Sequence, residues 1–401
     1  MLECKKLCLG GDGLRRYVRH IWNSFRKGDM VLLLLCLVLT AFGLLIIAST
    51  RNAVGYGRYV TIQLIAALLG VLVYAIVSSV DAEFFSEHRL AFTIFNVCLL
   101  LLLIPFGTDN GSGNRSWLAI PLMPVDIQPA EICKIFYILV CASVMSSHQS
   151  KPSSFKAVSH LAGHMLLLVG LNMALSKDLG VSLIFVFVFL GMAMSGGVNF
   201  LWFLGAIGVV VVSFPIWWNV LGDYQHNRIM ILFDSSIDPS GIKERFHIVR
   251  ALKSLTGGGL TGQGVFEGTR TQTEGALFAQ HTDFIFAAIG EELGFVGCML
   301  VLLMLVAIIA RCIWVGTRST DYMRKLICFG AASALIFQVC INVGMCLEFA
   351  PVIGLTLPFV SYGGSSIVTL YAMLGLVSGV YARPHPTSRE RYIRPPKRYL
   401  R

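Results

Sequence analysis

The sequence predicts an all-α integral membrane protein with about ten transmembrane helices, both termini cytoplasmic, and a long extracytoplasmic loop between helices 7 and 8. Of its 401 residues, 56% are hydrophobic and only 13% are charged, whereas about a quarter of a soluble domain is charged. Apolar runs of about twenty residues, long enough to cross the bilayer core, recur along the chain. One long polar stretch, 221–283, separates the seventh run from the eighth.

Each predicted helix is an apolar run with polar, Gly-containing or Pro-containing flanks. The fourth run is the most polar, because Glu131 and Lys134 lie in its first turn. The ninth contains several small residues, which favour a break near Gly344. The ten predicted helices are 29–50, 57–79, 91–107, 131–147, 158–175, 179–196, 199–220, 284–314, 326–349 and 365–382.

The distribution of basic residues predicts the orientation. With the N-terminus inside, 21 of the 32 Lys and Arg residues fall on the cytoplasmic side, as the positive-inside rule requires. The net charge of +10 therefore indicates contact with anionic headgroups, and we expect no nucleic-acid partner. We divide the chain into a basic segment at 1–28, a polytopic membrane domain at 29–383, and a basic tail at 384–401 whose composition is typical of disorder.

The polar residues that suggest chemistry gather on the outer side, in 108–130, 176–178, 221–283 and 350–364. A transporter more often places polar groups at the bilayer midplane, between broken helices. An enzyme that acts on a membrane-anchored substrate would place them at one interface. The pattern therefore favours an enzyme.

The long loop ends in Gln280-His281-Thr282-Asp283, and the apolar run begins at once with Phe284. A carboxylate at the end of a transmembrane segment is costly to desolvate. An apolar wall also raises its basicity, which suits proton abstraction from a hydroxyl. We predict that Asp283 is a general base; an N-cap is the plainer alternative. The sequence contains no Ser or Cys catalytic triad and no metal-ligand spacing.

Two other groups could hold an anionic substrate. Arg115 precedes Ser116-Trp117 and could grip a phosphate through its guanidinium, although an interfacial anchor is an equal alternative. Glu131 and Lys134 are three residues apart and therefore neighbours on one helix face. They either point into a cavity or form a self-satisfied ion pair.

The remaining outer segments leave alternatives open. Asp178 is either an N-cap or a functional residue. Residues 242–255 have the spacing of an amphipathic interfacial helix, and the glycines of 257–264 favour a flexible loop over a phosphate cradle. The Pro- and Gly-containing stretch 350–364 predicts a shaped loop, because non-helical backbone at membrane depth needs protein or water beside it.

Four of these motifs, in this order, resemble the SEDS family (shape, elongation, division and sporulation) of RodA/FtsW-type peptidoglycan glycosyltransferases. The resemblance extends from about residue 29 to residue 383. Its motifs are Gln128-Pro129-x-Glu131-x-x-Lys134, His281-Thr282-Asp283-Phe284-Ile285-Phe286, Glu291-Glu292-Leu293-Gly294 and Pro358-Phe359-Val360-Ser361-Tyr362-Gly363-Gly364-Ser365-Ser366.

The resemblance implies ten helices and polymerisation of lipid II at the outer face of a bacterial cytoplasmic (inner) membrane. It places the family's essential aspartate at Asp283. A class B penicillin-binding protein is the implied partner, beside other divisome or elongasome membrane proteins. The candidate substrate-binding residues are Glu131, Lys134, Arg115, Arg228, Lys253, His281, Ser361 and Ser365.

The sequence also departs from the family pattern. Phe278-Ala279 stand where the family usually has Pro-Glu before His-Thr-Asp, and Glu274 is the nearest stand-in. Ser116 replaces the usual Arg directly before the Trp, with Arg115 one position upstream. The core aspartate, Asp283, is intact.

The implied mechanism is a displacement with inversion. Asp283 takes the proton of an acceptor sugar's 4-hydroxyl, and that oxygen attacks the donor's anomeric carbon and displaces polyprenyl pyrophosphate. Positive charge near the pyrophosphate would come from Lys134, Arg115, Arg228 and Lys253, or from a divalent cation, Mg²⁺ or Mn²⁺. Two alternatives remain open: a lipid II flippase, and a non-enzymatic scaffold for wall synthesis.

Overall fold

The computed structural model describes residues 21–50, 57–108, 115–119, 126–220, 226, 230 and 245–383. Its helices are α2 (Met30–Ser49), α4 (Arg58–Ser78), α5 (Ala82–Glu87), α6 (Arg89–Leu101), α7 (Leu103–Phe106), α8 (Pro129–Ser147), α9 (Phe155–Leu175), α10 (Leu179–Ser195), α11 (Phe200–Val220), α13 (Phe246–Gly257), α14 (Ile285–Arg318), α15 (Tyr322–Cys346) and α16 (Gly364–Ala382). Strands β1 (Gly107–Thr108) and β2 (Trp117–Leu118) pair in antiparallel fashion.

The predicted membrane fold is confirmed. Eight helical stretches in the described ranges are long and apolar enough to span a bilayer, with α6 and α7 counted as one. The apolar helices α10 and α11 complete the predicted set, although their apolar stretches are shorter. The start of α2 lies beside the end of α16, because the backbone N–H of Asp29 donates to Ser378 Oγ at 2.9 Å. The two ends of the membrane domain therefore lie on the same side of the bundle, as an even number of crossings requires; whether that side is cytoplasmic stays a prediction.

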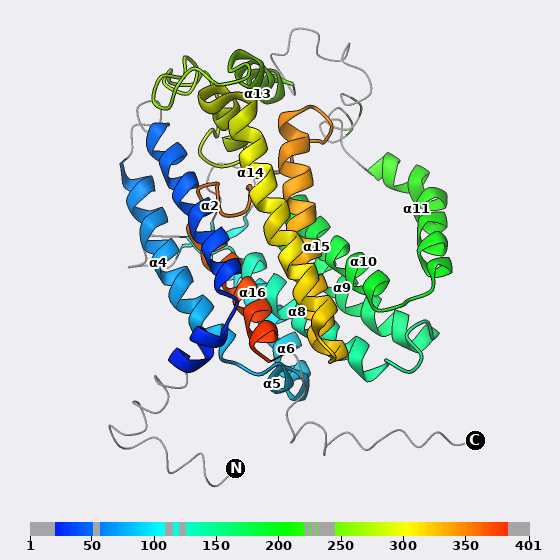
Figure 1. The fold of residues 1–401 in the computed structure, drawn as a ribbon. Helices are drawn as coiled ribbons and strands as arrows, with labels where there is room; N and C mark the ends of the chain where they lie inside the picture. Colours follow the sequence, from blue (N-terminus) through cyan, green and yellow to red (C-terminus); the bar gives the residue numbers. More distant parts are fainter. Residues whose placement is uncertain are drawn as a thin grey trace, which may run out of the picture.

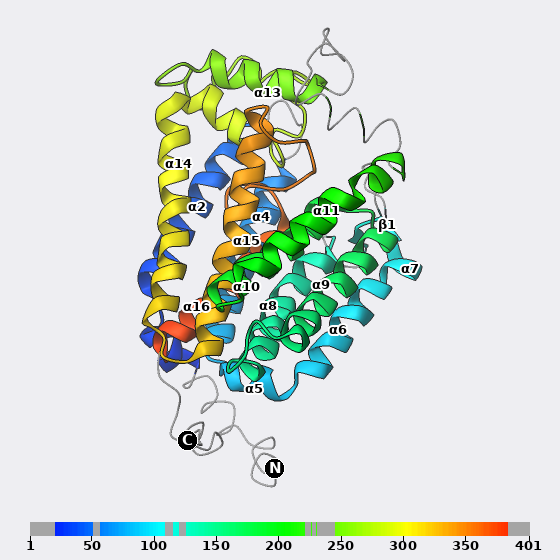
Figure 2. The same cartoon turned by 90° about the vertical axis from the view of Figure 1, so that its right-hand side faces the viewer.

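The helices are arranged around α15 and α16. Figures 1 and 2 show α2 and α4 on one side of this pair, α8, α9 and α10 on the other, and α13 lying across one end; α11 stands away from the bundle. The close approach of α4 to α16 depends on glycine, since a Cβ at Gly70 would lie 2.6 Å from the Tyr371 ring. Small residues allow this kind of packing between membrane helices.

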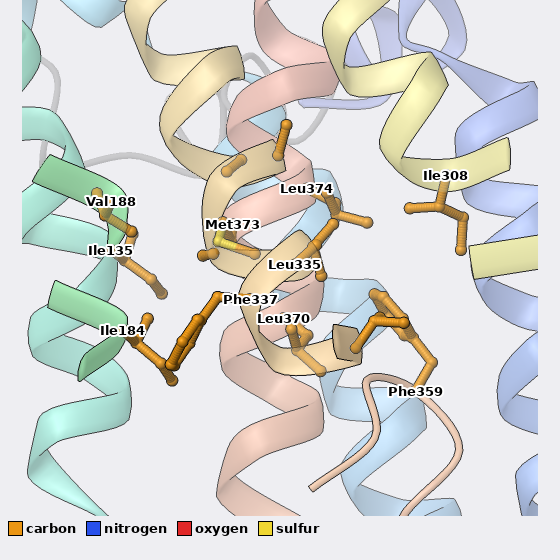
Figure 3. Close-up of a cluster of buried hydrophobic side chains, with 14 of the residues drawn as sticks. Ile135, Ile184, Val188, Ile308, Leu335, Phe337, Phe359, Leu370, Met373 and Leu374 are labelled. Atoms are coloured by element: carbon orange, nitrogen blue, oxygen red, sulfur yellow. The ribbon is translucent and has the colours of Figure 1, made fainter. Parts of the chain in front are cut away.

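The core fixes α15 in place. Figure 3 shows Phe337 of α15 directed toward Ile184 of α10, with Leu370 and Met373 of α16 nearby. All four side chains are buried in one hydrophobic cluster. Because such cores are close-packed, α15 presents its polar side chains from a rigid position.

The predicted break near Gly344 is wrong. Helix α15 continues to Cys346, and the Gly344 carbonyl accepts hydrogen bonds from the N–H groups of Phe349 (2.8 Å) and Ala350 (3.1 Å). The interruption lies in α14 instead, at Gly294, where φ is 68° and ψ is −163°. Glycine adopts this conformation without a steric penalty.

The glycine-rich stretch after α13 packs against this interruption, so its interpretation as a flexible loop is also wrong. The N–H groups of Gln263 and Gly264 donate to the carbonyls of Glu291 (2.9 Å) and Glu292 (3.0 Å). Gly262 has a φ of +82°, and a Cβ there would lie 2.2 Å from the Glu292 carbonyl oxygen. The glycines therefore permit close docking. The predicted amphipathic helix before them is confirmed as α13, which buries Ile248.

Candidate active site

A cavity of about 380 Å³ lies where several helices begin. The residues that precede or open α8, α10, α14 and α16 all contribute to its wall: Gln128 and Glu131, Asp178, Asp283, and Gly363 and Gly364. Its other described lining residues are Ser116, Trp117, Asp126, Val181, Thr282, Gln338, Ile353, Gly354, Leu355, Thr356, Tyr362 and Ser366. The N-terminal end of a helix carries partial positive charge, which attracts an anion, whereas the carboxylates of Asp126, Glu131, Asp178 and Asp283 in the same wall oppose one.

Asp283 is held by its backbone neighbours while its carboxylate lines the cavity. Asn342 Nδ2 donates to the Asp283 carbonyl at 2.8 Å and to the Leu355 carbonyl at 2.7 Å. Ser361 Oγ donates to the Thr282 carbonyl at 2.7 Å. These bonds fix the segment before α14 without using the Asp283 side chain, which stays open to the cavity.

The surroundings of Asp283 make it a better base. Burial and, to a smaller extent, the nearby negative charge of Asp178 together raise its pKa to about 6. A general base works best when its pKa lies near the operating pH. The structure therefore places a carboxylate with suitable basicity in a cavity large enough for a reacting group.

Asp178 is the predicted N-cap of α10, and a functional role for it stays a prediction. Its Oδ1 accepts from the Val181 N–H at 3.1 Å, which caps α10, and its Oδ2 accepts from Gln128 Nε2 at 2.9 Å. Its side chain also lines the cavity. Burial raises the pKa of Asp178, and the charge of Glu131 adds to this, whereas the two donors oppose it.

Glu131 and Lys134 form the predicted ion pair. Lys134 Nζ lies 2.9 Å from Glu131 Oε2, and the residues are only 1% and 3% exposed. Glu131 Oε2 also accepts from Thr369 Oγ1 at 3.1 Å and from Ser366 Oγ at 3.3 Å, both on α16. Glu131 lines the cavity, but Lys134 does not. The lysine charge is therefore directed to Glu131, not to the cavity.

Three other predicted residues lie in the wall behind the cavity lining. The His281 ring stacks on Tyr59 at 4.7 Å between ring centroids, and burial lowers the pKa of His281. Ser361 accepts from the Leu357 N–H at 2.8 Å, and Ser365 accepts from the Gln128 N–H at 3.4 Å. These side chains connect the segments that carry Asp283, α8 and α16.

The expected basic residues are not brought together. Arg115 and Lys253 are exposed, and neither lines the cavity; Arg228 lies outside the described residues. None of the described lining residues is basic. Arg115 lies shortly before β2, whereas Lys253 belongs to the surface helix α13.

Sequence reasoning missed Gln338, Asp126 and Tyr362 as lining residues. A polar Gln338 within an apolar run was a visible signal, and Asn342 lies four residues further on the same helix face. Which face of α15 meets a cavity depends on packing that the sequence does not display.

Comparisons with known proteins identify the family. A family model described as a cell cycle protein, FtsW/RodA/SpoVE, matches residues 29–384. The chain is 30% identical over 366 residues to the peptidoglycan glycosyltransferase MrdB of Escherichia coli K12, covering 90% of this chain and 95% of that protein. It is 32% identical over 375 residues to the probable peptidoglycan glycosyltransferase FtsW of Geobacter metallireducens, covering 90% and 96%.

A solved structure shares the fold. One chain of a peptidoglycan synthase complex, described for its coordination of polymerization and crosslinking, superposes with a TM-score of 0.74. That chain is 27% identical to this one, and the match covers 88% of this chain and 97% of the other.

Proposed function

Because this chain belongs to the FtsW/RodA/SpoVE family, we propose that the cavity beside Asp283 is where it polymerises lipid II into glycan strands. The chain is a multi-pass membrane protein and a peptidoglycan glycosyltransferase. The observation that carries the assignment of the site is Asp283 itself. Its backbone is held by Asn342, its carboxylate lines the cavity, and burial raises its pKa to about 6.

The proposed reaction forms one bond and breaks another. Asp283 accepts the proton of the acceptor sugar's 4-hydroxyl as that oxygen bonds to the anomeric carbon of the donor. The bond from the anomeric carbon to the pyrophosphate oxygen breaks, and polyprenyl pyrophosphate leaves with the bonding electrons. Attack from the opposite face inverts the anomeric configuration. The leaving group is already good, so a single base suffices.

We infer that helix N-termini, in place of basic side chains, stabilise the pyrophosphate. The starts of α8, α10, α14 and α16 meet at the cavity, and fixed dipoles stabilise charge without reorganisation. We place any Mg²⁺ or Mn²⁺ together with the pyrophosphate. Such cations use one or two carboxylates plus substrate phosphates, and Asp178 is one of the carboxylates that line the cavity; no set of three metal-ligating side chains occurs in the described part of the chain.

We also infer the setting of the reaction. The similarity to a chain of a complex that coordinates polymerization and crosslinking supports a class B penicillin-binding protein as the partner, with further divisome or elongasome membrane proteins around it. The predicted orientation places the cavity at the outer face of the bacterial inner membrane. Polymerisation there would deliver the new strand directly to the transpeptidase.

Polymerisation of labelled lipid II by the purified protein tests the proposal. We expect a ladder of glycan strands from the protein alone or with its transpeptidase. A protein that instead carries lipid II across vesicle membranes and gives no ladder under either condition would be a flippase. A protein that does neither, yet retains the transpeptidase in pull-down, would be a scaffold.

The rate of polymerisation should depend on pH through Asp283. Because its pKa is about 6, the base is protonated in acid, and kcat/KM should fall about tenfold per pH unit below that value and level off above it. Asp178→Asn removes a charge that raises the pKa of Asp283, so the midpoint should move to lower pH. A pH–rate profile that is flat between about pH 4 and 8 would contradict the assignment.

A further inference from the structure

A cluster of basic side chains lies at the end of the bundle opposite α13, where α6 and α9 begin and α8 ends (Figure 2). The ring centroid of His160 lies 5.7 Å from that of His148 and 5.3 Å from that of His164. Three helices contribute to this basic cluster, which consists of Arg89 of α6, His148 at the end of α8, and Lys156, His160 and His164 of α9.

The basic cluster contains positive charge without a matching negative one. The Arg89 guanidinium donates to the neutral Ser147 Oγ at 3.4 Å. Among the described residues, neither Arg89 nor Lys156 forms an ion pair, and the positive charges of both act on His160. Because like charges held close together repel one another, an anion that joined the cluster would lower its electrostatic energy.

The part of the cluster on α9 is accessible. Lys156, His160 and His164 are spaced four residues apart and therefore share one face of the helix. Leu167 continues this face one turn further. The first two side chains are exposed, His164 is half-buried, and Leu167 is 41% exposed. A Cβ added at Gly163 would have no neighbour within 4 Å. The face changes from basic to apolar along α9, the order in which a phospholipid presents its headgroup and its acyl chains.

The composition of the cluster favours an anion over a metal ion. His160 and His164 have the spacing of a metal-binding pair, but the described residues contain no group of three metal-ligating side chains. Arg89 and Lys156 would also repel a divalent cation. A guanidinium instead pairs with phosphate through directed hydrogen bonds.

The source of the anion follows from the place of the cluster in the membrane. Helix α9 is long and apolar enough to span a bilayer, and most of its apolar stretch is not buried in the protein. Ionisable side chains on a membrane helix usually have a partner, and basic sites between membrane helices bind the headgroups of anionic lipids. A lipid of the surrounding leaflet is therefore the anion that fits.

We propose that the basic cluster binds the phosphodiester headgroup of an anionic phospholipid, of the phosphatidylglycerol class, in the leaflet opposite the active-site cavity. Arg89 and His160 hold the phosphate oxygens, Lys156 adds charge at the membrane surface, and an acyl chain follows Leu167. A zwitterionic lipid fits less well, because these cations repel its ammonium group. The bound lipid bridges α6 and α9. This site is separate from the proposed polymerisation and does not depend on it.

Native mass spectrometry of the purified full chain tests the proposal, with the protein released from mixed micelles of phosphatidylglycerol and phosphatidylethanolamine. We expect the wild type to bind phosphatidylglycerol about tenfold more tightly, and Arg89→Gln to remove most of this preference, since a hydrogen bond to a charged group contributes about this much. Arg89 is exposed, so the variant should unfold at the same temperature as the wild type.

Arg318→Gln is the matched control. Arg318 ends α14 at the same end of the bundle, where its guanidinium lies 5.1 Å from the centroid of the Trp314 ring. The substitution removes the same charge but leaves the basic cluster intact, so the preference for phosphatidylglycerol should be kept. An equal loss in both variants would mean that only the overall charge of this face matters, and the proposed site would be wrong.

A photoreactive phosphatidylglycerol completes the test and needs no variant. In vesicles of phosphatidylethanolamine and phosphatidylcholine, its headgroup label should be found on peptides that contain the starts of α6 and α9. Labelling confined to other helices, or equal affinity of the wild type for the two lipids in the micelles, would overturn the inference. Titration with ZnCl₂ covers the alternative: Zn²⁺ bound through His160 and His164, without a lipid preference, would make the cluster a metal site.

Discussion

Replacement of Asp283 by asparagine is expected to reduce the rate of glycan polymerisation by about 10²–10⁴-fold, the usual size of a general-base contribution. Asparagine keeps the size of the side chain but cannot accept the proton of the acceptor hydroxyl. The hydrogen bonds that hold the segment come from Asn342 and Ser361 to backbone carbonyls, so they survive the substitution. The loss should appear in kcat, with lipid II still bound.

Stability separates this loss from misfolding. Burial raises the pKa of Asp283 above its value in the unfolded chain, so the folded state favours the protonated form. The stability that Asp283 contributes is present at low pH and is lost as pH rises from about 4 through about 6. At pH 7 to 8, Asp283→Asn should therefore unfold at the same temperature as the wild type, or higher.

The control variant is Asp126→Asn, which removes one negative charge from the same cavity, as Asp283→Asn does. Asp126 also lines it, and Asp126→Asn should lower the rate by less than about tenfold, since a change in the field alone is weaker than loss of the base. Polymerisation by Asp283→Asn within tenfold of the wild type would remove Asp283 from the chemistry.

The features that sequence predicts well here are local. An apolar run of sufficient length is enough to specify a membrane helix, so α2, α4 and α16 lie within two residues of their predicted bounds. The prediction that Asp283 is a general base also rests on a local signal, because a carboxylate next to an apolar run can be recognised in the sequence alone. The amphipathic spacing of α13 is a third example.

The features that sequence missed depend on distant contacts. The interruption of α14 at Gly294 is stabilised by a loop some thirty residues earlier, whose Gln263 and Gly264 donate to its carbonyls. Lys134 was expected to face the pyrophosphate, yet its ammonium group forms an ion pair with Glu131. That four helices begin at one cavity could not be read from any single motif, and neither could the face of α15 that carries Gln338.

Replacement of Lys134 by methionine alone is expected to destabilise the protein by about 3–5 kcal/mol, because it leaves a buried carboxylate without its cation. Glu131 is 3% exposed and lies 2.9 Å from the lysine nitrogen, so the substitution leaves its carboxylate with only the neutral donors Ser366 and Thr369. Thermal unfolding of the purified protein in one detergent, wild type against variant, measures the change.

The double variant Glu131→Gln with Lys134→Met should recover most of that stability, because no unpaired charge remains. The glutamine oxygen can still accept from Thr369 and Ser366, which now donate to Glu131. Asp321→Ala is a control for the loss of an N-cap carboxylate elsewhere, since Asp321 caps α15; the substitution should cost about 1 kcal/mol.

Stability and activity should separate in the double variant. Glu131 lines the cavity, and its predicted substrate-binding role needs the charge that glutamine lacks. We therefore expect a folded protein whose rate of glycan polymerisation stays at least about tenfold below the wild type, the loss that follows when one charged hydrogen bond to a substrate is removed. Recovery of both stability and rate would instead make the pair a structural clamp between α8 and α16, and the substrate-binding role of Glu131 and Lys134 would be wrong.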